Sequence, residues 1–264
     1  MQPHKHLAAV LDELQAAGRY TVTRHELQAI DERSSISLRS ALRRLKEKGR
    51  IASPRRGFYV IVPVEYRLAG SPPPTWYIDD LMAYLGQPYY VGLLSAAAIH
   101  GAAHQQPMIF QVVTDRPTRP AKTGRSRIEF HGCHQVGSIP VVEVQTETGT
   151  LRVSTPEATA FDLVHYLDAA GHLGNVTTVL SELAEEIDAR ALAETATLYT
   201  TADTQRLGYL MNVGGESKRT QELASWLASK RRRPVPLSPG RALGERASDP
   251  VWRVIENETV EVDL

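Results

Sequence analysis

Apolar residues recur at helical spacing in the segment from Ser34 to Lys48. Ser34 or Ser35 is suited to cap such a helix, because a hydroxyl oxygen accepts a hydrogen bond from a free backbone N–H. Gly49 is suited to end it, since glycine enters the left-handed region at little cost. The segment therefore predicts one amphipathic helix with 3.6 residues per turn. Its predicted apolar face consists of Ile36, Leu38, Ala41, Leu42 and Leu45.

The opposite face of this helix is polar and basic. Short hydroxyls early in the helix and cations later suit a helix that lies against a phosphate-lined groove. Taken alone, the same pattern is equally consistent with an ordinary solvated helix face, so the neighbouring segments decide between the two interpretations. The polar face consists of Ser37, Arg39, Ser40, Arg43, Arg44, Lys46 and Lys48.

The flanking segments predict a winged helix-turn-helix domain. A helix is expected over residues 5–17 and a short strand over 20–22. A second helix is expected from Thr23, because Glu26 stands three residues on, at the spacing of a capping box. Two strands, over 50–53 and 58–62, are expected on either side of a turn. In such a domain the third helix enters the major groove of DNA and the hairpin, called the wing, touches the DNA backbone.

The predicted DNA contacts fall into three groups. Cations are suited to phosphates, which position the protein, whereas residues early in the helix are suited to base edges. The most specific form of this hypothesis is a bidentate contact of Arg39 or Arg43 with guanine. The candidate base contacts are Ser35, Ser37, Arg39 and Ser40, the candidate phosphate contacts are Arg43, Arg44 and Lys46, and the candidate wing contacts are Arg55 and Arg56.

Charge is divided unevenly along a chain whose net charge is zero. Residues 1–62 contain twelve Lys and Arg but six Asp and Glu, a balance of +6 that the remaining residues offset with −6. A basic small domain joined to an acidic larger one indicates a polyanion as partner of the first. A winged helix used only for protein contacts remains an alternative, although it would not require this charge.

The remainder of the chain predicts a larger mixed domain. Residues 70–74 contain three consecutive prolines, so we expect a winged helix-turn-helix domain over 1–63, a stiff Pro-rich linker over 64–74 and a second domain over 75–264. The fold class is therefore α+β. The second domain is expected to hold strands at 109–114, 126–131, 141–145 and 149–153, a loop at 116–124, helices at 76–86 and 155–167, four helices between 176 and 229, and a terminal strand pair within 252–262.

Composition and motifs restrict the cellular compartment expected for the protein and the chemistry expected of it. The single cysteine, Cys133, excludes an intrachain disulfide and suits a reducing compartment. With no secretory signal and no apolar run of about eighteen residues, a cytoplasmic protein is expected. No phosphate-cradling glycine loop or nucleophile elbow occurs in the sequence. We therefore expect no catalytic residues and no cofactor.

Two weaker catalytic patterns complete the list of alternatives. His100 and His104 have metal-ligand spacing, but they lack the glutamate of a zinc protease motif, so no metal is expected. Asp115 and Glu143 follow the order of a nuclease motif, but Gln145 stands where that motif requires lysine.

The basic segments 116–127 and 230–233 are either solvated charge or an extension of the DNA contact.

Two stretches resemble the core signature of AbiEi antitoxins. They are the segment from Tyr89 to Thr114, which begins YYVGLLSAAAIHGAAH, and the segment from Val153 to Val164, VSTPEATAFDLV. The basic N-terminal segment resembles the winged helix of the same family. The resemblance implies the antitoxin of a bacterial type IV toxin–antitoxin system.

Several partners are implied by that resemblance alone. Antitoxins of this family bind inverted repeats in their own promoter and repress the operon, so two or more copies would sit on one double-stranded DNA site. They counteract a nucleotidyltransferase-like AbiEii toxin without a stable complex. A nucleic-acid-processing enzyme targeted by a winged helix, and a ligand-sensing transcriptional regulator, remain the alternatives.

Overall fold

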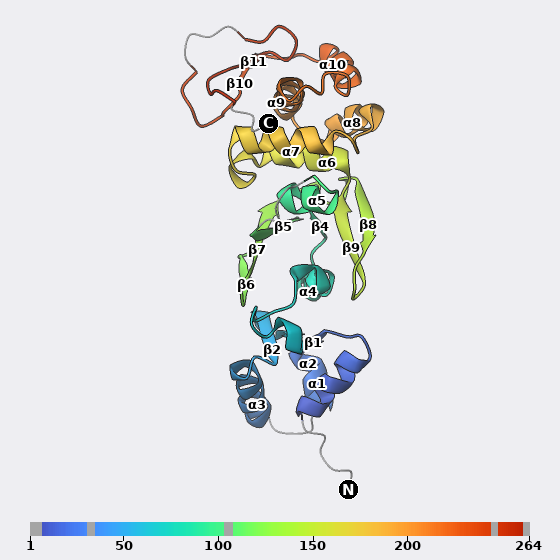
Figure 1. Ribbon diagram of the computed structural model, residues 1–264, viewed down its shortest axis with the longest axis vertical. Coiled ribbons are helices and arrows are strands. Elements are labelled where there is room, and N and C mark those ends of the chain that lie inside the picture. Colours follow the sequence, from blue (N-terminus) through green and yellow to red (C-terminus); the bar gives the residue numbers. More distant parts are fainter. Residues whose placement is uncertain (1–6, 31–34, 103–107, 244–247, 261–264) are drawn as a thin grey trace. The chain divides into compact units, whose positions relative to one another are not determined.

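A computed structural model of the chain describes residues 7–30, 35–102, 108–243 and 248–260 (Figure 1). Helices and strands both occur throughout this part, which confirms the predicted α+β class. The chain forms two compact units. The first comprises 1–89, 108–134 and 143–152, and the second comprises 90–107, 135–142 and 153–264. The domain boundaries expected around the 64–74 linker stay a prediction.

In the described part of residues 7–61 the elements follow the predicted order of helix, strand, helix, helix, strand, strand. The three strands form one antiparallel sheet in the order β1-β3-β2, with Thr21 opposite Val60 and Ile51 opposite Ile61. The elements are α1 (Leu7–Ala16), β1 (Thr21–Thr23), α2 (Arg24–Ile30), α3 (Ser35–Glu47), β2 (Ile51–Arg55) and β3 (Phe58–Ile61).

Local signals in the sequence account for the ends of these helices. The predicted capping box of α2 is present: the Thr23 N–H donates to Glu26 Oε2 at 2.7 Å, and the Glu26 N–H donates to Thr23 Oγ1 at 3.2 Å. Gly49 follows α3 with a φ of +63°, a conformation in which glycine is favoured. Ser34, one of the two predicted caps of α3, lies outside the described residues.

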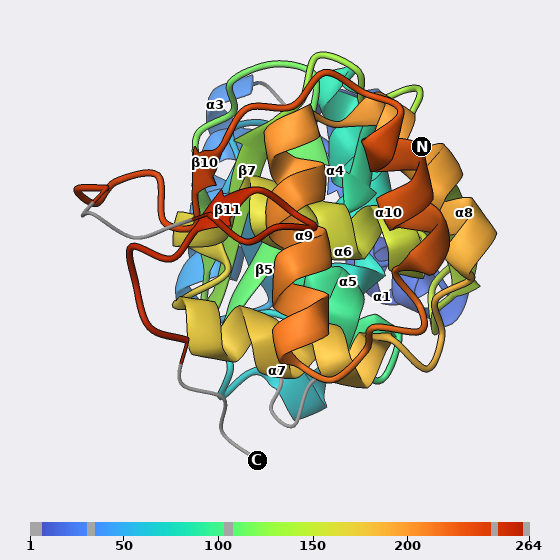
Figure 2. The same ribbon diagram turned by 90° about the horizontal axis from the view of Figure 1, so that it is seen from above.

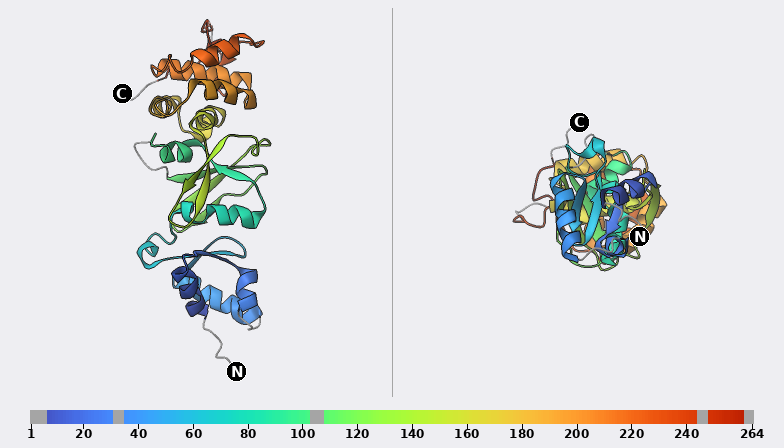
Figure 3. Two further views of the ribbon diagram at one scale, coloured as in Figure 1. Left: turned by 90° about the vertical axis from the view of Figure 1, so that its right-hand side faces the viewer. Right: turned by 90° about the horizontal axis from the view of Figure 1, so that it is seen from below.

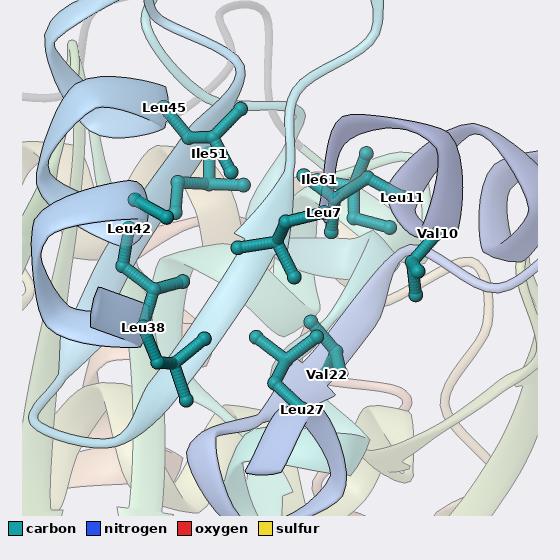
Figure 4. Close-up of a cluster of buried hydrophobic side chains, with 11 residues drawn as sticks. Leu7, Val10, Leu11, Val22, Leu27, Leu38, Leu42, Leu45, Ile51 and Ile61 are labelled. Atoms are coloured by element: carbon teal, nitrogen blue, oxygen red, sulfur yellow. The ribbon is translucent and has the colours of Figure 1, made fainter. Parts of the chain in front are cut away.

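One hydrophobic cluster joins α1, α2, α3 and the three-stranded sheet. Leu38, Leu42 and Leu45 of α3 face Leu7 and its buried neighbours (Figure 4). Burial of each leucine contributes about 1.5–3 kcal/mol, which fixes the rotation of α3 about its axis. The cluster consists of Leu7, Val10, Leu11, Val22, Leu27, Leu38, Ala41, Leu42, Leu45, Ile51 and Ile61.

The rest of the first unit is a helix and a group of strands. Strand β7 pairs in parallel with β5 and antiparallel with β6. Strand β6 corrects the prediction of a continuous loop at 116–124. Ala121 and Thr123 are buried on either side of exposed Lys122, an alternation too short to recognise in the sequence. The elements are the 3₁₀ turns η1 (Val64–Tyr66) and η2 (Pro74–Trp76), α4 (Ile78–Leu85), β5 (Ile109–Thr114), β6 (Ala121–Thr123) and β7 (Ser126–Gly132).

Three further strands contribute residues on both sides of the division between the units. They are β4 (Tyr89–Val91), β8 (Val141–Gln145) and β9 (Thr150–Ser154). Within the first unit the Thr146 N–H donates to the Gly149 carbonyl at 2.7 Å, which closes the turn between β8 and β9. Within the second unit β4 and β9 pair in parallel, with Val91 opposite Val153.

The second unit is mainly helical and is centred on α6. This helix is buried from Glu157 to Val164, because α5, α7, α8 and α9 all pack against it (Figures 2 and 3). None of the described helices of the protein is long and apolar enough to cross a bilayer. The helices are α5 (Leu93–Ile99), α6 (Pro156–His165), α7 (Leu173–Leu183), α8 (Ala189–Thr195), α9 (Thr201–Val213) and α10 (Gln221–Ala228), with the 3₁₀ turns η3 (Leu167–Ala169) and η4 (Ala196–Leu198).

The last described strands correct the predicted terminal pair. Strand β11 (Val254–Ile255) pairs in parallel with β10 (Val235–Pro236), and not with the described residues, up to 260, that follow it. The partner is therefore a segment that lies outside the predicted pair. Each strand has only two residues, so neither carries an alternating pattern long enough to identify it. Residues 261 and 262 of the predicted pair lie outside the described residues.

Candidate nucleic-acid interface

The face of α3 that points away from the hydrophobic cluster is predominantly polar and cationic. We call Ile36, Arg39, Ser40, Arg43 and Glu47 the outward face of α3. Leu38, Ala41, Leu42 and Leu45 are buried on the other side, as predicted. Ile36 was expected on that buried side, but its side chain is 73% exposed. Ile36 lies two positions before Leu38, a rotation of about 200° around the helix, so both cannot face the same core.

The other predicted contact residues on α3 are also accessible. Ser35, Arg44 and Lys46 are exposed, and Ser37 is half-buried. Since Arg44 and Lys46 lie in the last turn, they also complement the partial negative charge at the C-terminal end of the helix. The helix thus presents hydroxyls near its start and cations along its second half.

One acidic side chain shares the outward face with the cations. Arg43 Nε lies 3.5 Å from Glu47 Oε1, and both side chains are largely exposed. The spacing of four residues places them one turn apart on the same face. Glu47 was not singled out in the sequence analysis, although its position four residues after Arg43 is the signal that identifies the pair.

The two arginines of the hairpin have different environments. Arg56 lies in the turn between β2 and β3 and is exposed. Arg55 is half-buried, and its guanidinium donates to the carbonyl of Pro120 at 3.2 Å and to the carbonyl of Arg119. The guanidinium of Arg55 is therefore engaged within the first unit, whereas that of Arg56 faces solvent.

A groove lies between α2, the hairpin turn and α4. Arg24 and Arg56 are the cations in its lining, and the Tyr84 hydroxyl donates to the Arg56 carbonyl at 3.0 Å, which fixes the turn. Sequence reasoning did not select Arg24 or His25, because they precede the helix that carried the charge signal. The groove is lined by Thr23, Arg24, His25, Gln28, Arg56, Gly57 and Tyr84.

The second unit contains a buried polar group on α6. Asp162 is 1% exposed, and its Oδ1 accepts hydrogen bonds from Tyr199 at 2.8 Å and from Tyr90 at 3.2 Å. Its Oδ2 has no hydrogen-bond partner in the described part of the chain. One turn away, His165 Nδ1 lies 2.9 Å from Asp203 Oδ2, which also accepts a bond from the Thr200 hydroxyl.

The segment that carries this polar group matches a known family. The sequence model of the AbiEi antitoxin C-terminal domain matches residues 90–213. Residues 90–213, called the AbiEi domain below, are therefore similar to the C-terminal domain of AbiEi antitoxins. The resemblance predicted for the C-terminal part of the chain is confirmed, and the AbiEi domain supports a role as the antitoxin of a toxin–antitoxin system. Asp162, His165 and Asp203 all lie within the AbiEi domain.

A solved structure extends the comparison to nearly the whole chain. The crystal structure of the RV2827C protein from Mycobacterium tuberculosis superposes with a TM-score of 0.68 and 18% sequence identity, and the match covers 94% of this chain and 89% of that protein. At this identity the likeness shows a shared fold. A search of curated proteins finds no match to the sequence.

Burial controls the protonation of the AbiEi domain's polar group. It raises the pKa of Asp162 to about 7, against the opposite effects of the hydrogen bonds from Tyr199 and Tyr90. The hydrogen bond to Asp203 raises the pKa of His165. Burial opposes ionisation of Asp203, but the bonds from His165 and Thr200 outweigh it and lower the pKa of that carboxyl. The pKa values of Asp162 and Asp203 are thus shifted in opposite directions.

The histidines that were considered as metal ligands do not assemble into a site in the part of the chain that the structure describes. His100 Nε2 lies 2.7 Å from the Ser154 carbonyl within the AbiEi domain, and His104 lies outside the described residues. Over the described ranges no group of three or more His, Cys, Asp or Glu side chains could hold a metal ion.

Proposed function

We propose that the chain is the autoregulating antitoxin of a type IV toxin–antitoxin operon. In this proposal residues 1–63 are a winged helix-turn-helix module that binds inverted repeats in the operon's promoter, in the cytoplasm, and represses transcription. The observation that carries the proposal is the outward face of α3, where a rigidly packed helix presents Arg39, Ser40 and Arg43 to solvent.

The geometry of α3 supports separate tasks for its two halves. Its inward leucines fix its rotation, so its outward residues enter a major groove together. Ser35, Ser37, Arg39 and Ser40 are then the base contacts, and Arg43, Arg44 and Lys46 are the phosphate contacts. Arg56 reaches the backbone from the hairpin. Two copies on neighbouring half-sites would account for an inverted repeat.

The AbiEi domain carries the antitoxin part of the proposal. We assign residues 75–264 the task of counteracting an AbiEii-like, nucleotidyltransferase-like toxin by binding rather than by catalysis, and without a stable toxin complex. The family match supports this assignment. A repressor that only bound DNA would not require a second unit of this size.

The DNA-binding part is tested on the promoter of the chain's own operon. Fluorescence anisotropy with a labelled promoter duplex compares the wild type with an Arg39→Ala/Arg43→Ala/Arg44→Ala variant over a range of salt concentrations. Loss of three cations should weaken binding at least a hundredfold and lower the slope of log K against log salt by about 2–3. Thermal unfolding of the variant should match the wild type, because all three side chains are exposed.

A charge-matched control separates the outward face from overall charge. Arg190, Lys218 and Arg241 are exposed cations of the second unit, and their replacement by Ala should leave promoter affinity unchanged. Equal affinity of the α3 variant and the wild type would contradict the DNA-binding proposal. For the antitoxin part, co-expression with the toxin of the same operon should restore growth, and no rescue by a stable, well-expressed chain would contradict it.

A further inference from the structure

Ile36 has an unusual setting among the apolar residues of α3. The four others are buried, whereas Ile36 is 73% exposed. A single exposed apolar side chain is ordinary on a protein surface. Ile36, however, lies opposite the buried stripe, at the centre of the outward face, with Ser40 one turn further on. It therefore occupies the part of the helix that projects furthest from the core.

The side chains around Ile36 restrict what covers it. Arg39 and Arg43 flank it on the outward face and are exposed. With Glu47 as the one acid, the outward face still has a net positive charge. A second copy docking through the same face would bring two positively charged faces together, which is unfavourable. A polyanion with an apolar group among its hydrogen-bonding groups fits the surface better. The major groove of DNA offers this combination, because thymine presents its C5-methyl group there.

We propose that Ile36 reads a thymine in each half-site of the promoter by packing against its C5-methyl group. This inference rests on the proposed function. An isoleucine has no hydrogen-bonding group, so the methyl is the one feature of a base edge that it recognises favourably. The N-terminal residues of a recognition helix are those that contact base edges, and Ile36 is the second residue of α3. Arg39 and Arg43 would then read or position neighbouring bases and phosphates.

Replacement of thymine by uracil tests the contact directly, because uracil lacks only the methyl group. Each thymine of the half-sites is replaced in turn by deoxyuridine, and anisotropy measures the affinity of the full-length protein. We expect one position per half-site at which uracil weakens wild-type binding roughly fourfold, the effect of one buried methyl. Binding to the Ile36→Ala variant should be insensitive to uracil at that position.

Matched variants show that the loss belongs to Ile36. Ile30 is also an exposed isoleucine, at the end of α2, and Ile30→Ala should retain the full uracil effect. Ile36→Val retains a branched side chain and should retain most of it. Equal uracil effects in the wild type and Ile36→Ala, or none at any thymine, would overturn the proposal. So would a loss of self-association in Ile36→Ala without DNA, which would assign the side chain to a second copy.

Failure of the DNA-binding function and failure of the thymine contact give different results. Wild-type binding to the thymine-containing promoter reports the proposed function, whereas the uracil effect reports Ile36 alone. Tight binding without a uracil effect leaves the DNA-binding function standing and removes the role of Ile36. Absence of binding to the unmodified promoter contradicts both.

Discussion

The guanidinium carbon of Arg55 lies 5.4 Å from the ring centroid of Phe130, so a cation of the β2–β3 hairpin stacks on β7. The same guanidinium donates to the carbonyls of Arg119 and Pro120, beside β6. The residue expected at the wing tip thus fastens the hairpin to the other strands of the first unit. Its neighbour Arg56 is left exposed in the turn.

Adjacent arginines should therefore give opposite phenotypes when replaced by alanine. Arg55→Ala removes three hydrogen bonds, to the carbonyls of Pro54, Arg119 and Pro120, and a cation–π contact. This is a loss of about 1–2 kcal/mol that lowers the thermal midpoint by roughly 2–6 °C. Arg56→Ala leaves the thermal midpoint unchanged but lowers promoter affinity and reduces the salt slope by about 1. Calorimetry and anisotropy on both variants check this. If Arg55→Ala lost DNA affinity at an unchanged midpoint, Arg55 would be a direct DNA contact.

The ion pair between Arg43 and Glu47 predicts a variant that binds DNA more tightly. Glu47→Gln removes an acid that competes with phosphates for Arg43 and repels them. Promoter affinity should rise roughly two- to fivefold at low salt, since an exposed pair contributes about 0.2–1 kcal/mol. Glu194→Gln is the control, because Glu194 makes the corresponding pair with Arg190 on α8. Unchanged or weaker binding by Glu47→Gln would place Glu47 outside the interface.

Local signals in the sequence predicted much of the fold. The strong period of α3 identified its buried leucines, and α9 is one of the helices predicted between 176 and 229. The helix predicted over 155–167 begins with Pro156 at its first position, and the Thr155 hydroxyl accepts a hydrogen bond from the Ala158 N–H. The missed strands, β6 and β10, have only three and two residues. Such strands form because a partner is available, which a local pattern does not reveal.

In the candidate site, too, the environment of a side chain was predictable from the sequence only where local spacing determines it. The exposure of Arg39, Ser40 and Arg43 follows from the helical period alone. The environment of Arg55 depends on carbonyls more than sixty residues away, so charge and turn position could not predict it. The exposure of Ile36 was predictable in principle, because a strict 3.6-residue period places it opposite Leu38. Ile36 was predicted on the buried face because it is hydrophobic, although its spacing from Leu38 indicates the opposite face.

Gly208 is a position in α9 at which an added methyl group is expected to destabilise the fold. An alanine usually stabilises a helix interior relative to glycine by about 1 kcal/mol. Here a Cβ atom would lie 2.1 Å from the buried Trp252 ring, so the ring must move. Gly208→Ala should therefore lower stability by about 1–3 kcal/mol, measured by urea unfolding. Gly240→Ala, with open space around the added methyl, should have no such effect. Higher stability of the Gly208→Ala variant would contradict this prediction and show that the Trp252 ring moves without a loss of stability.

Asp162 predicts a pH dependence of stability in the AbiEi domain. Its pKa is raised from 3.8 to about 7 in the folded state, chiefly by burial. The folded protein therefore binds a proton more tightly than the unfolded chain between these values. Because stability falls with rising pH wherever the folded state holds more protons, Asp162 destabilises the protein progressively from about pH 4 to pH 7. Above pH 7 its contribution is constant.

Asp162→Asn replaces the carboxyl by a neutral group of the same shape and should remove this dependence. Relative to the wild type, the variant should gain about 2–3 kcal/mol of unfolding free energy between pH 5 and pH 8, measured by urea unfolding. Asp203→Asn is the informative contrast, because the pKa of Asp203 is lowered and its charged form stabilises the fold. That variant should lose stability at neutral pH and approach the wild type as the pH falls through the acid range. A constant difference between Asp162→Asn and the wild type at pH 5 and pH 8 would show that Asp162 does not titrate between them.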